Sequence, residues 1–370
     1  MKILITSGIF PPDIGGPASY VPKIATELSK RGHKVTVLCL SEQDFDDSKF
    51  NFDVIRINRR IFLPVRILLT IIKIISLSVK SDLIFANTLT FESSIGAILS
   101  RKPIVHKIVA DYAWEKLCEL NFYSDSFEEY QKAKKIFPIN LFEYYFKTPL
   151  LFSSKIITPS NYLKNFIRKW NRKLQIETIH NSFDFNAEFF KKHLDKGNSI
   201  KLVTVGRLEP VKGLIDLINR IDNTNFNLSL DIIGEGSQFD ELKLLTKNKK
   251  NIRLLGFLDQ NKVIEKLKSY DIFILNSFHE GLPNVLLEAT NAGLYLVAQN
   301  VGGCSEVIDH EKNGFLLERN IKKRDLDDAV KHFLNHNQED RLDHIQKFIK
   351  PKFGFKKMVN RTEKILINAV

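Results

Sequence analysis

At 370 residues, 44% of them hydrophobic and 26% charged, the chain has the composition of a folded protein and a length that favours two domains. The three cysteines lie far apart without a CxxC pair, which fits a reducing compartment and argues against a zinc site or a disulfide framework. The net charge is +12, and residues 1–180 account for +9 of it (26 Lys and Arg minus 17 Asp and Glu). The sequence contains no RNA-binding, zinc-finger or basic heptad pattern, so nucleic acid is the weakest candidate partner.

The first half of the chain alternates strand-like and helix-like segments. A helix is predicted over 17–31, and apolar strands are predicted at 2–7, 34–40, 53–58, 82–87, 103–109 and 155–160. Apolar strands separated by helices form parallel sheets covered on both faces, so this half predicts an α/β domain over residues 1–182. The first strand is too short for a signal-peptide hydrophobic region and has no cleavage site, so we expect a cytoplasmic protein.

The same alternation restarts after a polar segment at 187–199, which is predicted to be a linker. Strands at 201–206, 228–234, 252–257, 272–276 and 294–299 predict a second doubly wound domain over residues 198–352. In such sheets ligands bind at the carboxyl ends of the strands. Two domains of this type in tandem suggest a ligand in a cleft between them.

Two cations follow the strand at 201–206. Gly206 leads directly into Arg207, and Lys212 comes five residues later. An arginine fork and a lysine point charge at the carboxyl end of a strand suit a diphosphate. The sequence therefore predicts a diphosphate site at this position.

The strand at 272–276 leads into a turn that holds Glu280, Gly281, Leu282, Pro283 and Asn284. Pro283 is expected at the first position of a helix, so the N–H groups of this turn are predicted to face the same ligand. Helical spacing puts Glu288 on an apolar stripe, where a carboxylate is costly unless it is paired or binds a ligand. Because carboxylates repel phosphates, Glu280 and Glu288 are predicted to accept hydrogen bonds from hydroxyl groups, one of a sugar and one of a ribose.

Four segments carry a family resemblance: "VGRLEPVKG" (205–213), "IIGEG" (232–236), "HEGLPNVLLEA" (279–289) and "VGGCSEVI…NGFLL" (301–317). They closely resemble the retaining family-4 glycosyltransferases of GT-B fold, of the bacterial lipopolysaccharide and polysaccharide type. The resemblance is dense over 200–317 and looser over 1–180, where it includes Gly15 and Gly16 after the first strand. Residues 353–366 look like the helix that crosses back onto the first domain, so 353–370 are assigned to that domain.

The resemblance implies roles for the residues singled out above. Glu280 and Glu288 match the two carboxylates of the E-x7-E signature, of which the first faces the donor sugar and the second binds the ribose hydroxyls. Arg207 and Lys212 would hold the diphosphate of a UDP-sugar or GDP-sugar. The acceptor would be a saccharide or a lipid-linked saccharide, and front-side attack would give retention at the anomeric carbon.

The chain departs from the family pattern in the strand at 103–109. Many members end this strand in His-Gly, whereas here Val109 and Ala110 lead to Asp111. We predict that Asp111 faces the reacting sugar or the acceptor, and that His106 lies within the strand and is structural. The family also has a proline where this chain has Tyr295.

Each candidate site residue has a structural alternative. Arg207 and Lys212 would then be a solvated loop pair, Glu280 a surface acid, Glu288 a satisfied core carboxylate, and Gly15 with Gly16 a tight turn. The "DFD" sequence at 44–46 imitates the DxD metal motif of the other transferase fold, but it lies in a polar loop and is expected to be solvated. No other Asp, His or Cys cluster has ligand spacing, so no obligatory metal is predicted.

Two other functions stay open from the sequence. A nucleotide-sugar 2-epimerase of the same fold would use a similar pocket, and so would a non-catalytic nucleotide-sugar-binding protein. A dinucleotide dehydrogenase is disfavoured, because "SGIFPPDIGG" after the first strand is not a GxGxxG fingerprint.

The segment at 61–80 predicts a position at a membrane. Arg66, Lys73 and Lys80 recur every seven residues, so they share one face of a helix whose other positions are mostly Ile, Leu and Val. Two charges and a proline within 61–79 disfavour a spanning helix. We expect an interfacial helix that binds the anionic inner face of the cell membrane; the alternative is a helix packed on the sheet with its charges in water.

Overall fold

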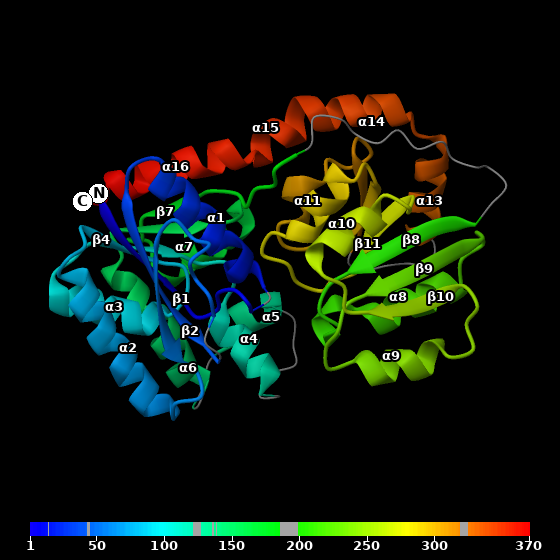
Figure 1. The fold of residues 1–370 in the computed structure, drawn as a ribbon. Helices are drawn as coiled ribbons and strands as arrows, with labels where there is room; N and C mark the ends of the chain where they lie inside the picture. Colours follow the sequence, from blue (N-terminus) through cyan, green and yellow to red (C-terminus); the bar gives the residue numbers. More distant parts are fainter. Residues whose placement is uncertain are drawn as a thin grey trace. The chain divides into compact units, whose positions relative to one another are not determined.

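The computed structural model describes residues 1–13, 15–42, 45–120, 127–134, 137, 139–185, 199–318 and 325–370. The chain forms two compact units: unit 1 contains residues 1–180 and 356–370, and unit 2 contains residues 181–355. Each unit is built on a parallel sheet with helices around it (Figure 1), so the predicted α/β fold with two doubly wound domains is confirmed. The predicted linker, apart from Ser199, lies outside the described residues.

Unit 1 has a seven-stranded sheet in the order β3-β2-β1-β4-β5-β6-β7, with all neighbours parallel. Its strands are β1 (Lys2–Ser7), β2 (Lys34–Ser41), β3 (Asp53–Asn58), β4 (Leu83–Ala86), β5 (Ile104–Lys107), β6 (Lys155–Thr158) and β7 (Ile176–Thr178). Its helices are α1 (Gly16–Lys30), α2 (Leu63–Ser78), α3 (Thr90–Ser100), α4 (Tyr112–Glu119), α5 (Phe127–Lys132), α6 (Ile139–Lys147), the 3₁₀ helix η1 (Thr148–Phe152), α7 (Asn161–Trp170) and α16 (Phe355–Ile367). Glu363 of α16 binds Arg31 at 2.6 Å and His33 at 2.8 Å, so this last helix packs beside the end of α1.

Unit 2 has a six-stranded sheet in the order β10-β9-β8-β11-β12-β13. Its strands are β8 (Ile200–Val205), β9 (Leu228–Ile233), β10 (Ile252–Gly256), β11 (Ile272–Leu275), β12 (Tyr295–Gln299) and β13 (Gly314–Leu317). Its helices are η2 (Pro210–Lys212, 3₁₀), α8 (Leu214–Asp222), α9 (Phe239–Thr246), α10 (Gln260–Leu267), α11 (Asn284–Asn291), α12 (Cys304–Val307), α13 (Asp325–Asn335), α14 (Gln338–His344), η3 (Ile345–Ile349, a π-helix) and α15 (Lys350–Phe353).

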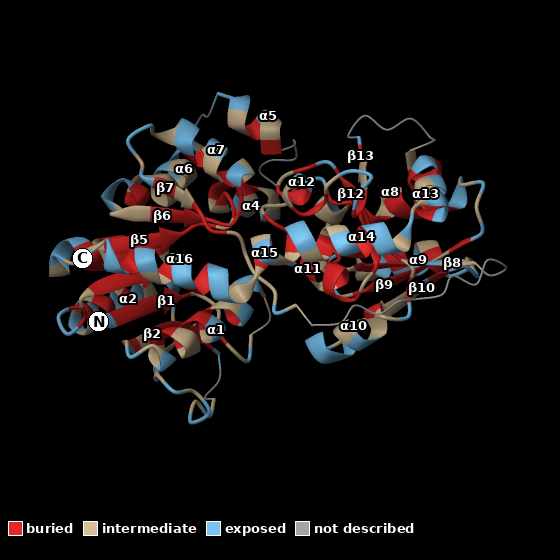
Figure 2. Ribbon diagram, turned by 90° about the horizontal axis from the view of Figure 1, so that it is seen from above, coloured by how far each residue is buried: buried red, intermediate tan, exposed pale blue. Residues whose placement is uncertain are grey.

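The central strands are buried on both faces, as a parallel sheet between two helix layers requires (Figure 2). In β12, Leu296 and Ala298 pack into one core of unit 2, whereas Tyr295 and Val297 pack into the core on the other side. This alternation follows from the two-residue period of a strand. Because side chains on both faces of the sheet are buried, these strands appear as continuous apolar runs in the sequence.

The sequence analysis missed two edge strands, β7 and β13. They contain three and four residues, and each pairs with a single neighbour, β6 or β12. Such short strands give no periodic signal. Three predicted strands are too long by two residues or more. β4 spans only Leu83–Ala86, β5 ends at Lys107 rather than 109, and β6 ends at Thr158 because Ser160 caps α7.

The apolar segment predicted at 61–79 forms α2, which packs beside α3 on one face of the unit 1 sheet. The two helices approach closely, because a Cβ atom on Gly96 of α3 would lie 2.3 Å from Cγ2 of Ile74. Among the described residues, no helix is long and apolar enough to cross a membrane.

Arg341 in α14 orders the chain just before β12. It is buried, and its guanidinium donates to the carbonyl oxygen atoms of Gly293 at 3.0 Å and Leu294 at 2.8 Å. The strand then begins at Tyr295, whose hydroxyl lies 2.6 Å from Nδ1 of His332. The family's proline is therefore replaced by a buried side chain with its own polar partner.

His106 lies within β5 and is completely buried. Its Nε2 and Nδ1 atoms lie 3.2 Å from Oγ of Ser94 and 2.8 Å from Oγ of Ser153. Burial disfavours the charged imidazolium and lowers the pKa of His106 to about 4. The predicted structural role of His106 is confirmed.

We expect His106 to make unit 1 less stable in mild acid, with its free energy of unfolding falling by about 2 kcal/mol between pH 7 and pH 5. The folded imidazole stays neutral down to its pKa of about 4, whereas in the unfolded chain it takes up a proton near its ordinary value of 6.5. The contribution is therefore complete above about pH 6.5 and is lost as the pH falls toward 4. The free energy of unfolding at each pH is measured by urea unfolding, followed by the fluorescence of Trp114 and Trp170, which both lie in unit 1.

The comparison variant is His106→Asn. It should be less stable than the wild type at pH 7, because a buried ring is lost, but it should lose less stability on going to pH 5. Equal losses in the two proteins would assign the pH dependence to other groups.

Candidate active site

The carboxyl end of β8 carries both predicted cations of unit 2. Gly206 continues the strand, because its N–H donates to the Ile233 carbonyl oxygen at 3.0 Å. Arg207 is exposed, and its guanidinium makes no hydrogen bond or ion pair with the part of the chain that the structure describes. Lys212 ends η2, and together with Gly206 and Arg207 it lines a small hollow at the ends of β8, β9 and β11.

Lys212 is paired with a carboxylate from the neighbouring strand end. Its Nζ lies 2.6 Å from Oε1 of Glu280, and the two side chains are 21% and 12% exposed. Because β8 and β11 are neighbours in the sheet, the loops that follow them meet at the same edge. The structure thus brings together two of the residues that the sequence singled out, 68 positions apart in the chain.

The turn after β11 lies against the loop after β12. A Cβ atom on Gly302 would lie 1.6 Å from the Glu280 carbonyl oxygen, and one on Gly303 would lie 2.4 Å from that of Gly281. The N–H of Gly303 donates to the Glu280 oxygen at 3.2 Å. Glycine is required at these two positions because the backbones touch.

Pro283 does not occupy the predicted first position of the helix. It is the N-cap residue of α11, with φ −74° and ψ 109°, and the helix begins at Asn284. Because the ψ angle of Pro283 is extended, the helix begins one residue later than predicted. Leu282 and Pro283 are buried, whereas Asn284 is exposed and accepts a hydrogen bond from Asn181 Nδ2 at 3.0 Å.

Glu288 is half-buried rather than part of the apolar stripe, which corrects the prediction from helical spacing. The buried positions of α11 are Leu286, Leu287, Ala289, Thr290 and Asn291. Glu288 instead lies one helical turn after the exposed Asn284, on the more open side. Its Oε1 accepts a hydrogen bond from Gln260 Nε2 of α10 at 3.3 Å.

The sequence analysis missed Asn276, which connects the start of α8 to the end of β12. It is buried directly after β11, and its Nδ2 donates to the Gly213 carbonyl oxygen at 2.8 Å and to Asp216 at 3.0 Å. Its Oδ1 accepts a hydrogen bond from Gln299 Nε2 at 2.8 Å. An asparagine at the end of an otherwise apolar strand was the available signal, because buried amides need partners.

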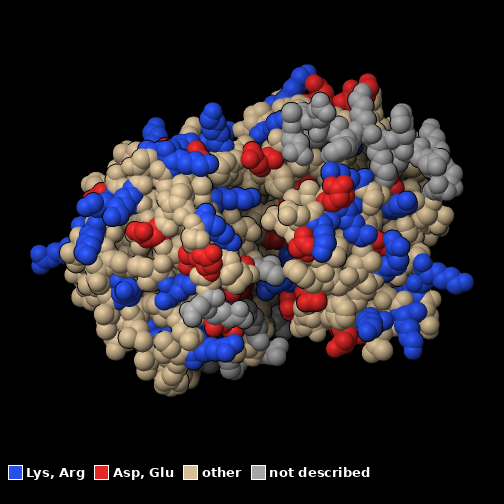
Figure 3. Space-filling view, viewed as in Figure 1, with Lys and Arg blue, Asp and Glu red and all other residues tan. Residues whose placement is uncertain are grey.

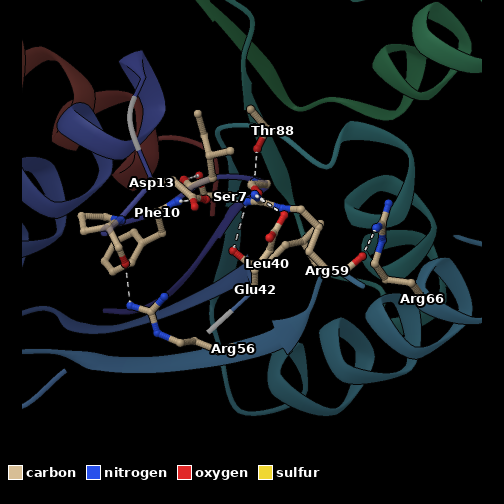
Figure 4. Close-up of polar contacts among 12 residues, drawn as sticks. Ser7, Phe10, Asp13, Leu40, Glu42, Arg56, Arg59, Arg66 and Thr88 are labelled. Atoms are coloured by element: carbon tan, nitrogen blue, oxygen red, sulfur yellow. Dashed lines mark hydrogen bonds and ion pairs between the residues drawn. The ribbon is translucent and has the colours of Figure 1, made fainter. Parts of the chain in front are cut away.

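In unit 1 the predicted glycines lie at the end of a loop that an arginine holds. Gly15 precedes α1 with φ 149°, and Gly16 is the first residue of that helix. Figure 4 shows Arg59, which follows β3, pointing into the loop after β1, where its guanidinium contacts the Asp13 carboxylate and donates to the Gly8 carbonyl oxygen at 2.9 Å. The sequence analysis did not single out this arginine.

Asp111 is the N-cap of α4 and is almost completely buried. Oδ1 accepts hydrogen bonds from the N–H groups of Ala113 at 3.1 Å and Trp114 at 3.2 Å, and Oδ2 accepts one from Gln131 at 2.8 Å. Lys147 lies 3.7 Å from Oδ2. Both carboxylate oxygens are therefore engaged in holding α4, α5 and α6, which favours a structural role over the predicted contact with a sugar.

Lys107, the last residue of β5, is a second buried ionisable group close to Asp111 in the chain. Its Nζ lies 3.6 Å from the centroid of the Tyr20 ring of α1, a cation–π distance. Burial lowers the pKa of Lys107 to about 7. No periodic or motif signal marks this lysine, because it ends an ordinary apolar strand.

The "DFD" sequence lies only in part within the described residues. Asp44 falls outside them, and the Asp46 carboxylate accepts a hydrogen bond from the Ser48 N–H at 3.0 Å. In the residues that the structure describes, no group of three or more His, Cys, Asp or Glu side chains is placed to hold a metal ion. The metal-independent reaction stays a prediction.

Comparison with protein families gives two matches. The model described as Glycosyltransferase Family 4 matches residues 14–187, and the model described as Glycosyl transferases group 1 matches residues 185–350. The two matches meet where unit 1 ends and unit 2 begins.

Individual relatives agree with these matches. The chain is 25% identical over 382 aligned residues to an uncharacterized glycosyltransferase of Methanocaldococcus jannaschii, covering 99% of this chain and 97% of that protein. It is 32% identical over 184 residues to the UDP-Gal:alpha-D-GlcNAc-diphosphoundecaprenol alpha-1,3-galactosyltransferase of Escherichia coli, but this match covers only 46% of this chain and 45% of that protein.

The fold matches that of HepE from Anabaena, solved in complex with UDP and glucose, with a TM-score of 0.76 at 19% identity over 100% of both chains. At that identity the likeness is one of fold. The two family matches, the M. jannaschii relative and this fold lead to one assignment, which the sequence resemblance had predicted. The chain belongs to the family-4 glycosyltransferases of GT-B fold.

Proposed function

We propose that unit 2 binds a nucleoside diphosphate sugar and that the protein transfers the sugar, with retention at the anomeric carbon, to a hydroxyl group of a saccharide or lipid-linked saccharide. The observation that carries the proposal is the Lys212–Glu280 pair beside the exposed, unpaired guanidinium of Arg207, within the described chain. A cation pair next to a carboxylate suits a ligand that is anionic at one end and carries hydroxyl groups at the other.

The diphosphate would lie between Arg207 and Lys212. On donor binding, Lys212 would exchange Glu280 for a phosphate oxygen, and Glu280 would then accept a hydrogen bond from a sugar hydroxyl. The two cations, together with the N–H groups of Gly281 and Asn284, would stabilise the leaving diphosphate without a metal ion.

In the transfer step the bond between the anomeric carbon and the phosphate oxygen breaks, and a bond to the acceptor oxygen forms on the same face. The acceptor proton passes to the departing phosphate oxygen, so charge and atoms balance. This front-side route needs no carboxylate nucleophile. It therefore agrees with Asp111 being buried and hydrogen-bonded. We assign Asp111 a positioning role.

Glu288 would accept hydrogen bonds from the ribose hydroxyls, since its partner Gln260 is a neutral amide that a ligand can replace. The UDP in HepE supports a UDP-sugar, with a GDP-sugar as the other choice. The name of the E. coli relative supports a lipid-linked acceptor, and with it a place in surface polysaccharide, lipopolysaccharide or glycolipid synthesis in the cytoplasm.

The direct test is incubation with labelled UDP-sugars and GDP-sugars and a panel of saccharide and lipid-linked acceptors. Formation of an acceptor glycoside that keeps the donor's anomeric configuration supports the proposal. An epimerised donor without glycoside would indicate a 2-epimerase, and binding without turnover would indicate a nucleotide-sugar-binding protein.

Glu288→Ala should weaken the binding of free UDP or GDP, because the ribose loses its acceptor. Calorimetry measures this change. The matched control is Glu265→Ala, which removes an exposed carboxylate from α10 that pairs with Lys268. Unchanged nucleotide binding in Glu288→Ala would contradict the assignment.

Glu280→Ala should leave nucleotide affinity intact or raise it, because Lys212 loses its carboxylate partner and is free for the diphosphate. Transfer should fall strongly, because the sugar loses its hydrogen-bond acceptor. Comparing calorimetry with turnover separates the two effects. An equal loss of nucleotide binding in the Glu280 and Glu288 variants would refute this division of roles.

Arg207→Ala and Lys212→Ala should each remove on the order of 2–4 kcal/mol of transition-state stabilisation, seen as a lower kcat/KM, since each removes a charge from the leaving diphosphate. Lys331→Ala, which removes an exposed lysine from α13, is the control and should behave as wild type.

Activity should also survive treatment with EDTA. Loss of transfer that Mg²⁺ or Mn²⁺ restores would disprove the metal-free arrangement.

A further inference from the structure

Helix α2 of unit 1 turns its more polar side toward the protein. Its buried residues are Thr70, Ile74 and Ser78, which lie four positions apart and therefore on one face. The hydroxyl groups of Thr70 and Ser78 donate to carbonyl oxygens of the same helix, at 2.7 Å and 2.6 Å. These hydroxyls are satisfied locally, so the buried face needs few apolar atoms.

The opposite side of α2 is apolar and exposed. Five side chains on it are between 42% and 67% exposed: Val65, Leu68, Leu69, Ile72 and Val79. Phe62 and Leu63 continue this surface at the start of the helix, where they are 73% and 53% exposed. We name these seven residues the α2 apolar face. On an ordinary surface helix these positions would hold polar or charged residues.

Neighbouring elements add exposed apolar residues. α3 lies beside α2 (Figure 1), and Ile98 and Leu99 are exposed at its end. The helix η1 packs against α3 and exposes Leu151 and Phe152. Because α2 and α3 both run from carboxyl to amino ends of parallel strands, Val79 and the end of α3 lie at the same edge of the sheet.

The exposed charged side chains of α2 and the residue directly after α3 are basic. Residues 54–81 contain six basic residues and no Asp or Glu. Three of the six, Arg56, Arg59 and Arg60, pair with carboxylates from outside this range. Lys73 and Lys80 are exposed and share one edge of the α2 apolar face. Arg101, directly after α3, is exposed as well. Figure 3 shows Lys and Arg side chains spread over the visible side of unit 1, with Asp and Glu side chains in several places among them.

We infer that the α2 apolar face docks on a bilayer that contains anionic lipids. The apolar side chains would enter the boundary between headgroups and acyl chains, while Lys73, Lys80 and Arg101 would meet the headgroup phosphates. A second copy of the chain fits less well, because a two-fold symmetric contact would bring the basic edges together. Only one part of this inference rests on the proposed function: a docked bilayer would hold the lipid-linked acceptor.

The test is co-sedimentation of the whole protein with vesicles of phosphatidylcholine, with or without phosphatidylglycerol. The wild type should bind the anionic vesicles at low salt, and the binding should weaken as salt rises. The double variant Leu68→Asp with Ile72→Asp should bind roughly tenfold more weakly, because two charges would have to enter the membrane. Lys73→Glu with Lys80→Glu should lose roughly fivefold for each basic residue removed.

Leu244→Asp is the matched control, since Leu244 is 75% exposed on α9 of unit 2 and is not part of the α2 apolar face. It should bind vesicles as the wild type does, and circular dichroism should show every variant folded. UDP binding in solution should be unchanged in all of them, so a failure here is distinct from a failure of the proposed donor site. Absence of wild-type binding to anionic vesicles, an equal loss in Leu244→Asp, or a dimer in light scattering that Leu68→Asp with Ile72→Asp dissociates would overturn the inference.

Discussion

The candidate site of unit 2 depends on backbone contacts between loops that leave no room for a side chain. A Cβ atom on Gly234 would lie 1.8 Å from the Gly206 carbonyl oxygen, and one on Gly302 would lie 1.6 Å from that of Glu280. Gly234 also has φ 143°, which glycine adopts without cost. The loops after β9 and β12 thereby fix the backbone next to Arg207 and at Glu280. The position of both side chains is set by the sheet, which is the rigid support that an electrostatic site needs.

The rigid loops hold Lys212 and Glu280 together as an ion pair. Both side chains are largely removed from water, so neither charge can stay unpaired without a desolvation cost. A diphosphate can replace Glu280 as the partner of Lys212 only if it offers more charge, and a sugar hydroxyl must then satisfy the carboxylate. In the proposed function, the pair would therefore couple recognition of the two ends of one ligand. The Arg207 guanidinium has no hydrogen-bond or ion-pair partner among the described residues. In the proposed function, its binding to the diphosphate would therefore be opposed mainly by the entropy cost of ordering its side chain.

Sequence reasoning succeeded where topology alone brings residues together. Arg207, Lys212 and Glu280 all follow strands, and parallel strands end at the same edge of a sheet, so their proximity followed from the predicted elements. It failed where one residue decides local geometry. Because of the ψ angle of Pro283, α11 starts one residue later than predicted. The sequence analysis also did not foresee that Asp111 caps α4, although an Asp before a helix is itself a capping signal. The partners of Arg59 and Asn276 depend on loops whose paths no periodicity predicts.

The composition of α2 needs two separate explanations. Its small and hydroxyl-bearing inner face follows from packing, because α3 approaches so closely that Gly96 has no space for a Cβ atom beside Ile74. That constraint says nothing about the outer face, where a polar side chain would cost the fold nothing. Leucine, isoleucine and valine there expose apolar area to water, and a patch of such residues carries an aggregation risk in solution. Packing within unit 1 therefore accounts for one face of α2 but not for the other, which the proposed docking on a bilayer would explain.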